Sequence, residues 1–156
     1  MKSFSGASLY EKRVLLRVDF NVPLDQKQNI IDDERILAAL PTIKQLISDR
    51  AKIIIMSHLG RPKGKEKSFS LKPVATRLSH LLKKNVLFCN DCIQEKNKLI
   101  INKMSGGDIL LLENLRFYNE EKSGDISFAK KLSEYGDIFI NDAFGVSHRK
   151  HASVFT

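Results

Sequence analysis

"KIIIMSHLGRPKG", residues 52–64, joins a short apolar run to a loop rich in glycine and basic residues. Residues 52–56 are almost continuously apolar, which is typical of a strand buried on both faces of a parallel sheet. The polar loop follows at the carboxyl end of that strand, where open α/β sheets bind their ligands. This stretch therefore predicts both a fold class and the place of a functional site.

Four other runs have the same character: "RVLLRV" (13–18), "NVLF" (85–88), "DILLL" (108–112) and "DIFI" (137–140). Each is short, rich in leucine or β-branched residues, and nearly continuous rather than alternating. We therefore expect five buried strands in one parallel sheet.

Segments with helical spacing lie between these runs. Residues 32–48 and 70–82 carry apolar side chains at intervals of three and four, with Ser70 as the expected cap of the second helix. A third helix is expected from Asp125, with Ile126, Ala129 and Leu132 facing inward and Gly136 ending it, and residues 92–104 have the weakest helical pattern. Alternation of strands and helices predicts an α/β fold, a three-layer α/β/α Rossmann-like domain with right-handed crossovers.

The composition bounds the class of protein. The 156 residues can form one domain or part of a larger protein, and 42% apolar residues are enough to build a core. A formal charge of +8 predicts attraction to anions such as phosphate metabolites or nucleic acid. The chain has no apolar stretch of about 20 residues for a membrane span and no secretory signal, so we expect a cytoplasmic protein without a membrane partner.

The two cysteines, Cys89 and Cys92, form a C-x-x-C pair. Such a pair is compatible with a redox site or with half of a zinc site, but zinc needs two further ligands and there is no second cysteine pair. We therefore favour reduced thiols at a strand end and expect no metal site.

Polar and basic residues collect where the predicted strands end. Because the carboxyl ends of parallel strands meet at one edge of the sheet, these side chains are expected to lie together. An arginine guanidinium binds carboxylate or phosphate through two parallel hydrogen bonds and stays charged near neutral pH. The candidates are Asp19, Asn21, Arg35, His58, Arg61, Arg116 and Arg149, with His148 as a weaker one.

One such arginine alone is usually a solvated surface residue, but four at successive strand ends favour an anion site. Asp19 and Asn21 are suited to orienting a neutral hydroxyl. The residue types thus predict a small ligand with more than one acidic group. The loop at residues 60–65 lacks the spacing of a Walker phosphate loop, and no G-x-G-x-x-G follows the first strand, so no cofactor-binding site is expected in this chain.

Four stretches of the chain resemble signatures of the phosphoglycerate kinase family: "RVDFNVPLD", "SHLGRPKG", "LLENLRFYNEE" and "GDIFINDAFGVSHRKHAS". They occur in the family's order and at its spacing over essentially the whole chain. The resemblance implies the amino-terminal domain of such a kinase, which binds 3-phosphoglycerate or 1,3-bisphosphoglycerate.

The resemblance also implies roles for the candidates. Asp19 and Asn21 match residues at the hydroxyl end of the substrate, and Arg35 matches the catalytic arginine beside the carboxyl group that exchanges the phosphoryl group. The basic residues around the phosphate that is not transferred are matched by His58, Arg61, Arg116 and Arg149.

The family's second half has no counterpart in residues 1–156, which we expect to be a truncated amino-terminal domain, incomplete at its carboxy-terminal end. Mg-ATP or Mg-ADP is expected on the missing nucleotide domain, and the full-length protein is expected to be monomeric. The chain alone is expected to bind 3-phosphoglycerate without turnover. The alternatives are a basic nucleic-acid-binding α/β module, although aromatic residues are few at 8%, and an inert folding unit.

Overall fold

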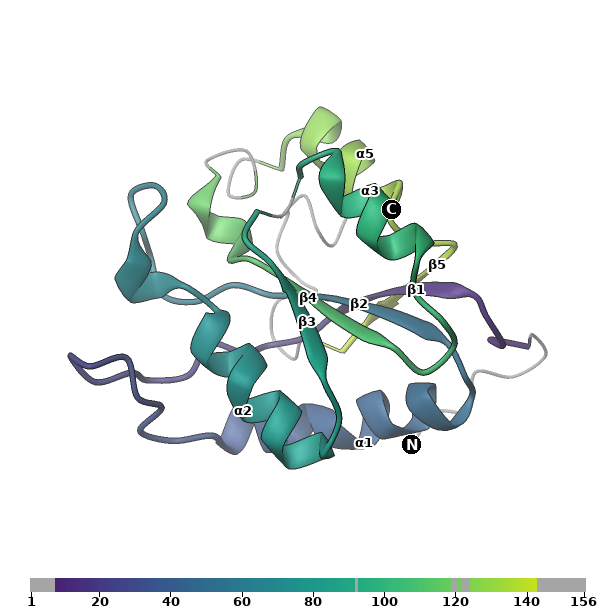
Figure 1. Ribbon diagram of the computed structural model, residues 1–156. Helices are drawn as coiled ribbons and strands as arrows, with labels where there is room; N and C mark the ends of the chain where they lie inside the picture. The colour runs from purple at the N-terminus through teal and green to yellow at the C-terminus, as the bar shows by residue number, and fades with distance from the viewer. Residues whose placement is uncertain (1–7, 92, 119–120, 122–123, 143–156) are drawn as a thin grey trace.

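A computed structural model describes residues 8–91, 93–118, 121 and 124–142. Within these residues five strands form one sheet in the order β3-β4-β2-β1-β5, and every pair of neighbours is parallel (Figure 1). Their bounds are Arg13–Arg17 (β1), Lys52–Met56 (β2), Val86–Cys89 (β3), Ile109–Leu112 (β4) and Ile138–Asn141 (β5). Each expected strand is present to within one residue at either end.

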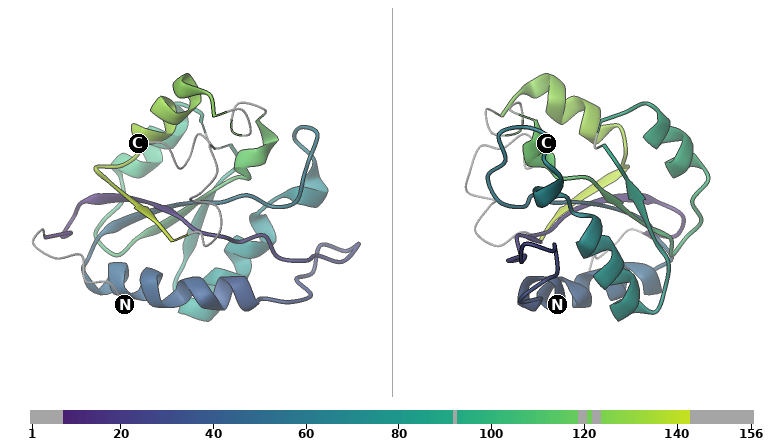
Figure 2. Two further views of the ribbon diagram at one scale, coloured as in Figure 1. Left: turned by 180° about the vertical axis from the view of Figure 1, so that it is seen from behind. Right: turned by 60° about the vertical axis from the view of Figure 1, so that its left-hand side comes forward.

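Among the described residues, four helices cover the sheet: α1 (Glu34–Ser48), α2 (Lys72–Leu82), α3 (Lys96–Asn102) and α5 (Ile126–Ser133). Helices α1 and α2 lie on one face, and α3 and α5 lie on the other (Figure 2). Two short 3-10 turns, Lys67–Phe69 and Leu115–Phe117, follow β2 and β4. The expected three-layer α/β/α architecture is therefore confirmed.

The apolar core has two parts because successive strand residues point to opposite faces. On β2, Ile53 and Ile55 pack with α1 and α2, whereas Ile54 and Met56 pack with α3 and α5. All four side chains are fully or almost fully buried. Burial on both faces explains why β2 is a continuous apolar run in the sequence.

The direction in which successive strands are added to the sheet reverses once, after β3. From β1 to β2 to β3 the chain moves toward one edge with α1 and α2 on one face, and from β3 to β4 to β5 it moves back with α3 and α5 on the other. Right-handed crossovers require the helices to change face when the direction changes. The chain therefore leaves the neighbouring strands β2 and β4 toward opposite faces, and such a reversal at the carboxyl ends of the strands is where open α/β sheets bind their ligands.

Two local expectations were wrong. Ile126 is 83% exposed, whereas Leu132 is buried as expected and Ala129 packs against the same cluster; Phe128, whose N–H is accepted by the capping residue Asp125, takes the inward position near the start of α5. Ser70 is not the cap residue of α2, since the helix begins at Lys72. The Ser70 hydroxyl accepts the N–H of Lys72 at 3.2 Å and donates to Glu113 at 2.7 Å, so it links the helix to the end of β4.

Within the described ranges, no helix is long and apolar enough to cross a bilayer.

Candidate functional site

The loops after β2 and β4 are joined by the side chain of Asn114, which is fully buried. Its Oδ1 accepts the backbone N–H groups of Leu59 and Arg116, at 3.1 and 3.0 Å. Its Nδ2 donates to the carbonyls of Leu59 at 2.8 Å and Phe69 at 2.9 Å. One asparagine thus satisfies four backbone groups that would otherwise be buried without partners, and fixes the two loops against each other.

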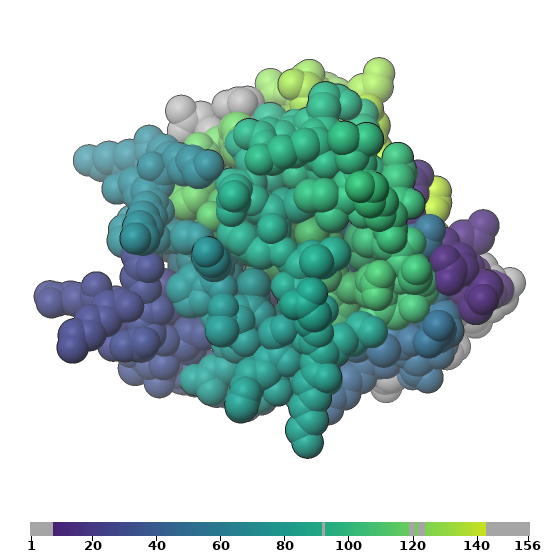
Figure 3. Space-filling model, viewed as in Figure 1, coloured from purple at the N-terminus to yellow at the C-terminus, as the bar shows by residue number. Residues whose placement is uncertain are grey.

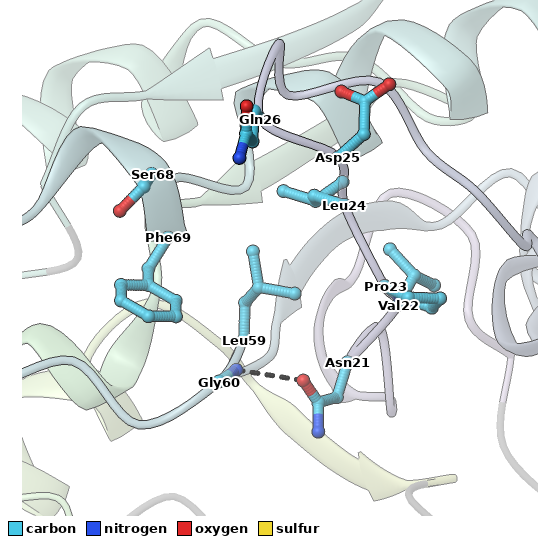
Figure 4. A pocket seen from close by; sticks show the side chains of 10 residues that line it. All are labelled: Asn21, Val22, Pro23, Leu24, Asp25, Gln26, Leu59, Gly60, Ser68 and Phe69. Atoms are coloured by element: carbon cyan, nitrogen blue, oxygen red, sulfur yellow. Dashed lines mark hydrogen bonds between the residues drawn. The ribbon is translucent and has the colours of Figure 1, made fainter.

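The loop after β1 joins this arrangement through Asn21 and Gly60. Asn21 Oδ1 accepts the Gly60 N–H at 2.8 Å, and the Gly60 carbonyl accepts a hydrogen bond from Arg116 Nη1 at 3.1 Å. The Oδ1 atom faces Gly60, so the Nδ2 group of Asn21 points away from it (Figure 4). Hydrogen bonds therefore connect the ends of β1, β2 and β4.

Arg35 lies in the first turn of α1 and reaches back to the β1 loop. Its Nη1 contacts Asp19 Oδ1 at 3.3 Å and the Asn21 carbonyl at 3.0 Å. The arginine side chain is 51% exposed, so solvent screens this ion pair and a competing anion can approach. A pocket of about 380 Å³ opens here, lined by Asp19, Arg35, Ala38, Ala39 and Asp142.

His58 is almost fully buried and lies beside Arg17, the last residue of β1. The His58 Nδ1 atom is 3.1 Å from Arg17 Nη2, and Arg17 Nη1 forms an ion pair with Glu121 at 2.9 Å. Both members of the pair are fully buried. Burial lowers the pKa of Arg17 from its ordinary value, and the carboxylate of Glu121 opposes that shift.

The remaining predicted residues are Arg61, Arg149 and His148. Arg61 is exposed and forms no hydrogen bond or ion pair with another described residue. Arg149 and His148 lie outside the described residues. The structure thus brings Asp19, Asn21 and Arg35 together and connects them through Gly60 to Arg116, with His58 on the buried side of the same loops.

Both the backbone conformation and the neighbouring Phe69 ring require a glycine at position 60. Its φ is +61°, which side chains rarely adopt, and an added Cβ would lie 2.5 Å from the ring of Phe69. Behind it is a second pocket of about 420 Å³ between the β1 loop and the β2 loop (Figure 4). In the space-filling view these two loops project as separate lobes on one side of the molecule (Figure 3).

Sequence reasoning missed three charged residues behind the site. Arg17 was interpreted only as part of a strand, and Glu121 and Glu113 were not singled out. Glu113 accepts the N–H groups of Leu71 and Asn114, both at 2.8 Å, and is almost fully buried. An arginine within an otherwise apolar strand was the available signal for Arg17, because such a buried cation needs a partner.

Only one cysteine of the C-x-x-C pair lies within the described residues. Cys89 is buried, and burial raises the pKa of its thiol to about 11. Cys92 lies outside the described residues, and in the part of the chain that is described no group of three or more His, Cys, Asp or Glu side chains is placed to hold a metal ion.

Comparison with known proteins adds the decisive observation. The sequence model of the family described as phosphoglycerate kinase matches residues 4–156. This chain belongs to the phosphoglycerate kinase family. The match covers the segments that carry Asp19, Arg35, His58 and Arg116.

Individual phosphoglycerate kinases agree with this assignment. The chain is 51% identical over 154 residues to the phosphoglycerate kinase of Aquifex aeolicus and 53% identical over 155 residues to that of Coprothermobacter proteolyticus. In both cases the alignment covers 99% of this chain and 39% of the relative. A crystal structure of phosphoglycerate kinase from Pyrococcus horikoshii superposes with a TM-score of 0.87 at 35% identity, over 98% of this chain and 39% of the other. The chain thus spans about two fifths of the length of these kinases.

Proposed function

We propose that this chain carries the 3-phosphoglycerate-binding half of a phosphoglycerate kinase, the glycolytic enzyme that exchanges a phosphoryl group between 1,3-bisphosphoglycerate and ADP. The observation that carries the proposal is the chain of hydrogen bonds from Arg35 through Asp19 and Asn21 to Gly60 and Arg116. It fixes two arginines and an amide at one edge of the sheet, which suits a ligand with an acidic group at each end.

The proposed roles follow from the chemistry of each group. Arg35 would lie beside the carboxylate that accepts the phosphoryl group and stabilise charge on the group in transit. Asp19 and the Nδ2 group of Asn21 would orient the substrate hydroxyl. The remaining candidates, His58, Arg61, Arg116 and Arg149, would surround the phosphate that is not transferred; the arginines would neutralise its charge, and His58 would contribute a hydrogen bond.

Phosphoryl transfer needs positioning and charge stabilisation more than a covalent intermediate, so these residue types are sufficient for the substrate half of the reaction. The nucleotide and its magnesium ion would supply the other half from residues outside this chain. We infer that the chain alone binds 3-phosphoglycerate but does not turn over. A cytoplasmic setting fits this reaction.

Binding is tested by isothermal titration calorimetry with 3-phosphoglycerate, against sulfate at equal ionic strength. The matched variants are Arg35→Met and Lys44→Met, which remove the same charge from the same helix about 13 Å apart along its axis. Lys44 is exposed, so its loss controls for net charge. The proposal requires binding that Arg35→Met weakens at least tenfold and Lys44→Met leaves within about twofold; equal weakening would reduce the effect to general electrostatics.

Turnover is tested separately. Purified chain is mixed with Mg-ATP and 3-phosphoglycerate, and formation of ADP is followed. Formation of ADP at the rate of a complete phosphoglycerate kinase would refute the inference that this chain does not turn over.

A further inference from the structure

We propose that Arg17 is a positioning residue that holds His58 in the tautomer protonated on Nε2. The inference rests on the proposed function only in identifying the ligand as a phosphate. The geometry itself concerns three buried side chains, Arg17, His58 and Glu121, which come from β1, the β2 loop and the segment after β4.

The tautomer follows from the donor inventory. A guanidinium has only N–H donors and does not lose its proton near neutral pH, so it cannot accept a hydrogen bond. At the 3.1 Å contact, Arg17 Nη2 must therefore donate and His58 Nδ1 must accept. A ring with its lone pair on Nδ1 carries its proton on Nε2.

Glu121 explains why the arginine can be there. A buried guanidinium loses its hydration, and that loss is tolerable only with a hydrogen-bonded counter-ion. Glu121 supplies one at 2.9 Å, on Nη1, and leaves Nη2 directed at the histidine. Arg17 is also fixed by its backbone, because it is paired in register with Met56 of β2, two residues before His58.

The consequence concerns phosphate recognition. Any partner of His58 Nε2 must accept a hydrogen bond, and in the proposed complex this partner is a phosphate oxygen. The other tautomer would present a lone pair to the phosphate and an N–H to the guanidinium, and both contacts would be unfavourable. Arg17 thus prepares a neutral histidine as a donor without itself contacting the ligand.

The tautomer is measured by long-range ¹H–¹⁵N NMR correlation of the histidine rings at neutral pH, without ligand. His58 should show a pyridine-like Nδ1 and a pyrrole-like Nε2. The exposed His80 should show averaged shifts, and the single variants His58→Gln and His80→Gln assign the signals. A pyrrole-like Nδ1, or averaged shifts at His58, would overturn the proposal.

The role of Arg17 is tested with the double variant Arg17→Met/Glu121→Met, which removes both members of the buried ion pair together. Its His58 shifts should move toward the averaged values, and 3-phosphoglycerate should bind about tenfold more weakly, as expected for a displaced hydrogen bond to a charged group. The control, Arg13→Met/Asp137→Asn, removes an exposed pair from the same sheet region and should change neither readout. An unchanged His58 tautomer in the first variant would refute the positioning role.

The two proposals fail separately. The unsubstituted protein reports its tautomer without ligand, so this readout remains decisive even if the double variant does not fold. If that tautomer is as expected but 3-phosphoglycerate does not bind, the proposed function is refuted while the inference about Arg17 and His58 stands.

Discussion

Replacing Asn114 with alanine should loosen the carboxyl edge of the sheet without unfolding the domain. The side chain is fully buried and makes four hydrogen bonds to backbone groups of three residues, Leu59, Phe69 and Arg116. The substitution removes all four bonds and leaves the space of an amide group next to the freed backbone groups.

The magnitude follows from that count. A net contribution of about 1 kcal/mol per hydrogen bond gives an upper value of about 4 kcal/mol, and a water entering the vacated space would restore part of it. We therefore expect the free energy of unfolding to fall by about 2–4 kcal/mol. Domains of this size are usually stable by about 5–15 kcal/mol, so the variant should stay folded at 25 °C.

The assay is urea denaturation, with the midpoint and the m-value compared for Asn114→Ala and for the control Asn102→Ala. Asn102 is exposed at the end of α3, so its loss should change stability little. Affinity for 3-phosphoglycerate should also fall, because Asn114 aligns the loops that carry Gly60 and Arg116. A loss of stability below about 1 kcal/mol would refute the hydrogen-bond account. A loss of the predicted size with unchanged affinity for 3-phosphoglycerate would show that these contacts stabilise the domain without shaping the site.

Three further predictions follow from single residues. Gly60→Ala should lower the free energy of unfolding by at least about 1 kcal/mol, because φ is +61° and the new Cβ would meet the ring of Phe69. The control Gly64→Ala has open space around the new Cβ and should not lower it. Equal urea midpoints for the two variants would contradict this prediction. Cys89 should resist alkylation in the native protein at pH 8, because a thiol pKa of about 11 leaves only about one molecule in a thousand as thiolate. Mass spectrometry of the peptide that contains Cys89 measures the extent of alkylation. Rapid alkylation of the native protein would contradict the burial of this thiol. Asp137→Asn should lower stability slightly near pH 7, because the hydrogen bond from Arg13 stabilises the carboxylate and lowers the pKa of Asp137 below 3.8. This stabilisation is lost as the pH falls from about 3.8 through the lowered pKa, because the carboxylate is then protonated. The stability difference from the unsubstituted protein, measured by urea titration at several pH values, should therefore shrink in acid, and a difference that grows in acid would show the sign to be wrong.

The fold could be predicted because the inner strands are buried on both faces. Burial disfavours polar residues, so β2 and β4 are visible as nearly continuous apolar runs, whereas the edge strands β3 and β5, also expected to be buried, are partly exposed. Helix rotation is less visible, because a first-turn residue such as Ile126 fits the apolar period but projects into solvent. The hydrogen bond from the Phe128 N–H to Asp125 fixes where α5 begins, and packing against the sheet buries Phe128 rather than Ile126, which a count of apolar positions does not include.

The site could be predicted only in part, for a related reason. Strand ends and arginines are local features of a sequence, so Arg35 and Arg116 could be found. The partner of a buried charge is not local, since Arg17 and Glu121 are 104 residues apart in the chain. The sequence shows that Arg17 interrupts an apolar run, but not which acid satisfies it.

Burial also separates arginines that look alike in the sequence. Arg17 is fully buried and its charge is balanced by Glu121, so it adds little to the field outside the protein. Arg35 is half exposed, and its pairing with Asp19 is weak enough for an incoming anion to compete. The attraction of the site for anions should therefore come from Arg35 and its exposed neighbours and weaken with salt, whereas the His58 tautomer should not change with salt. In the proposed complex the two kinds of arginine would thus have different roles: Arg35 would attract the ligand, and Arg17 would hold His58 as the hydrogen-bond donor that contacts it.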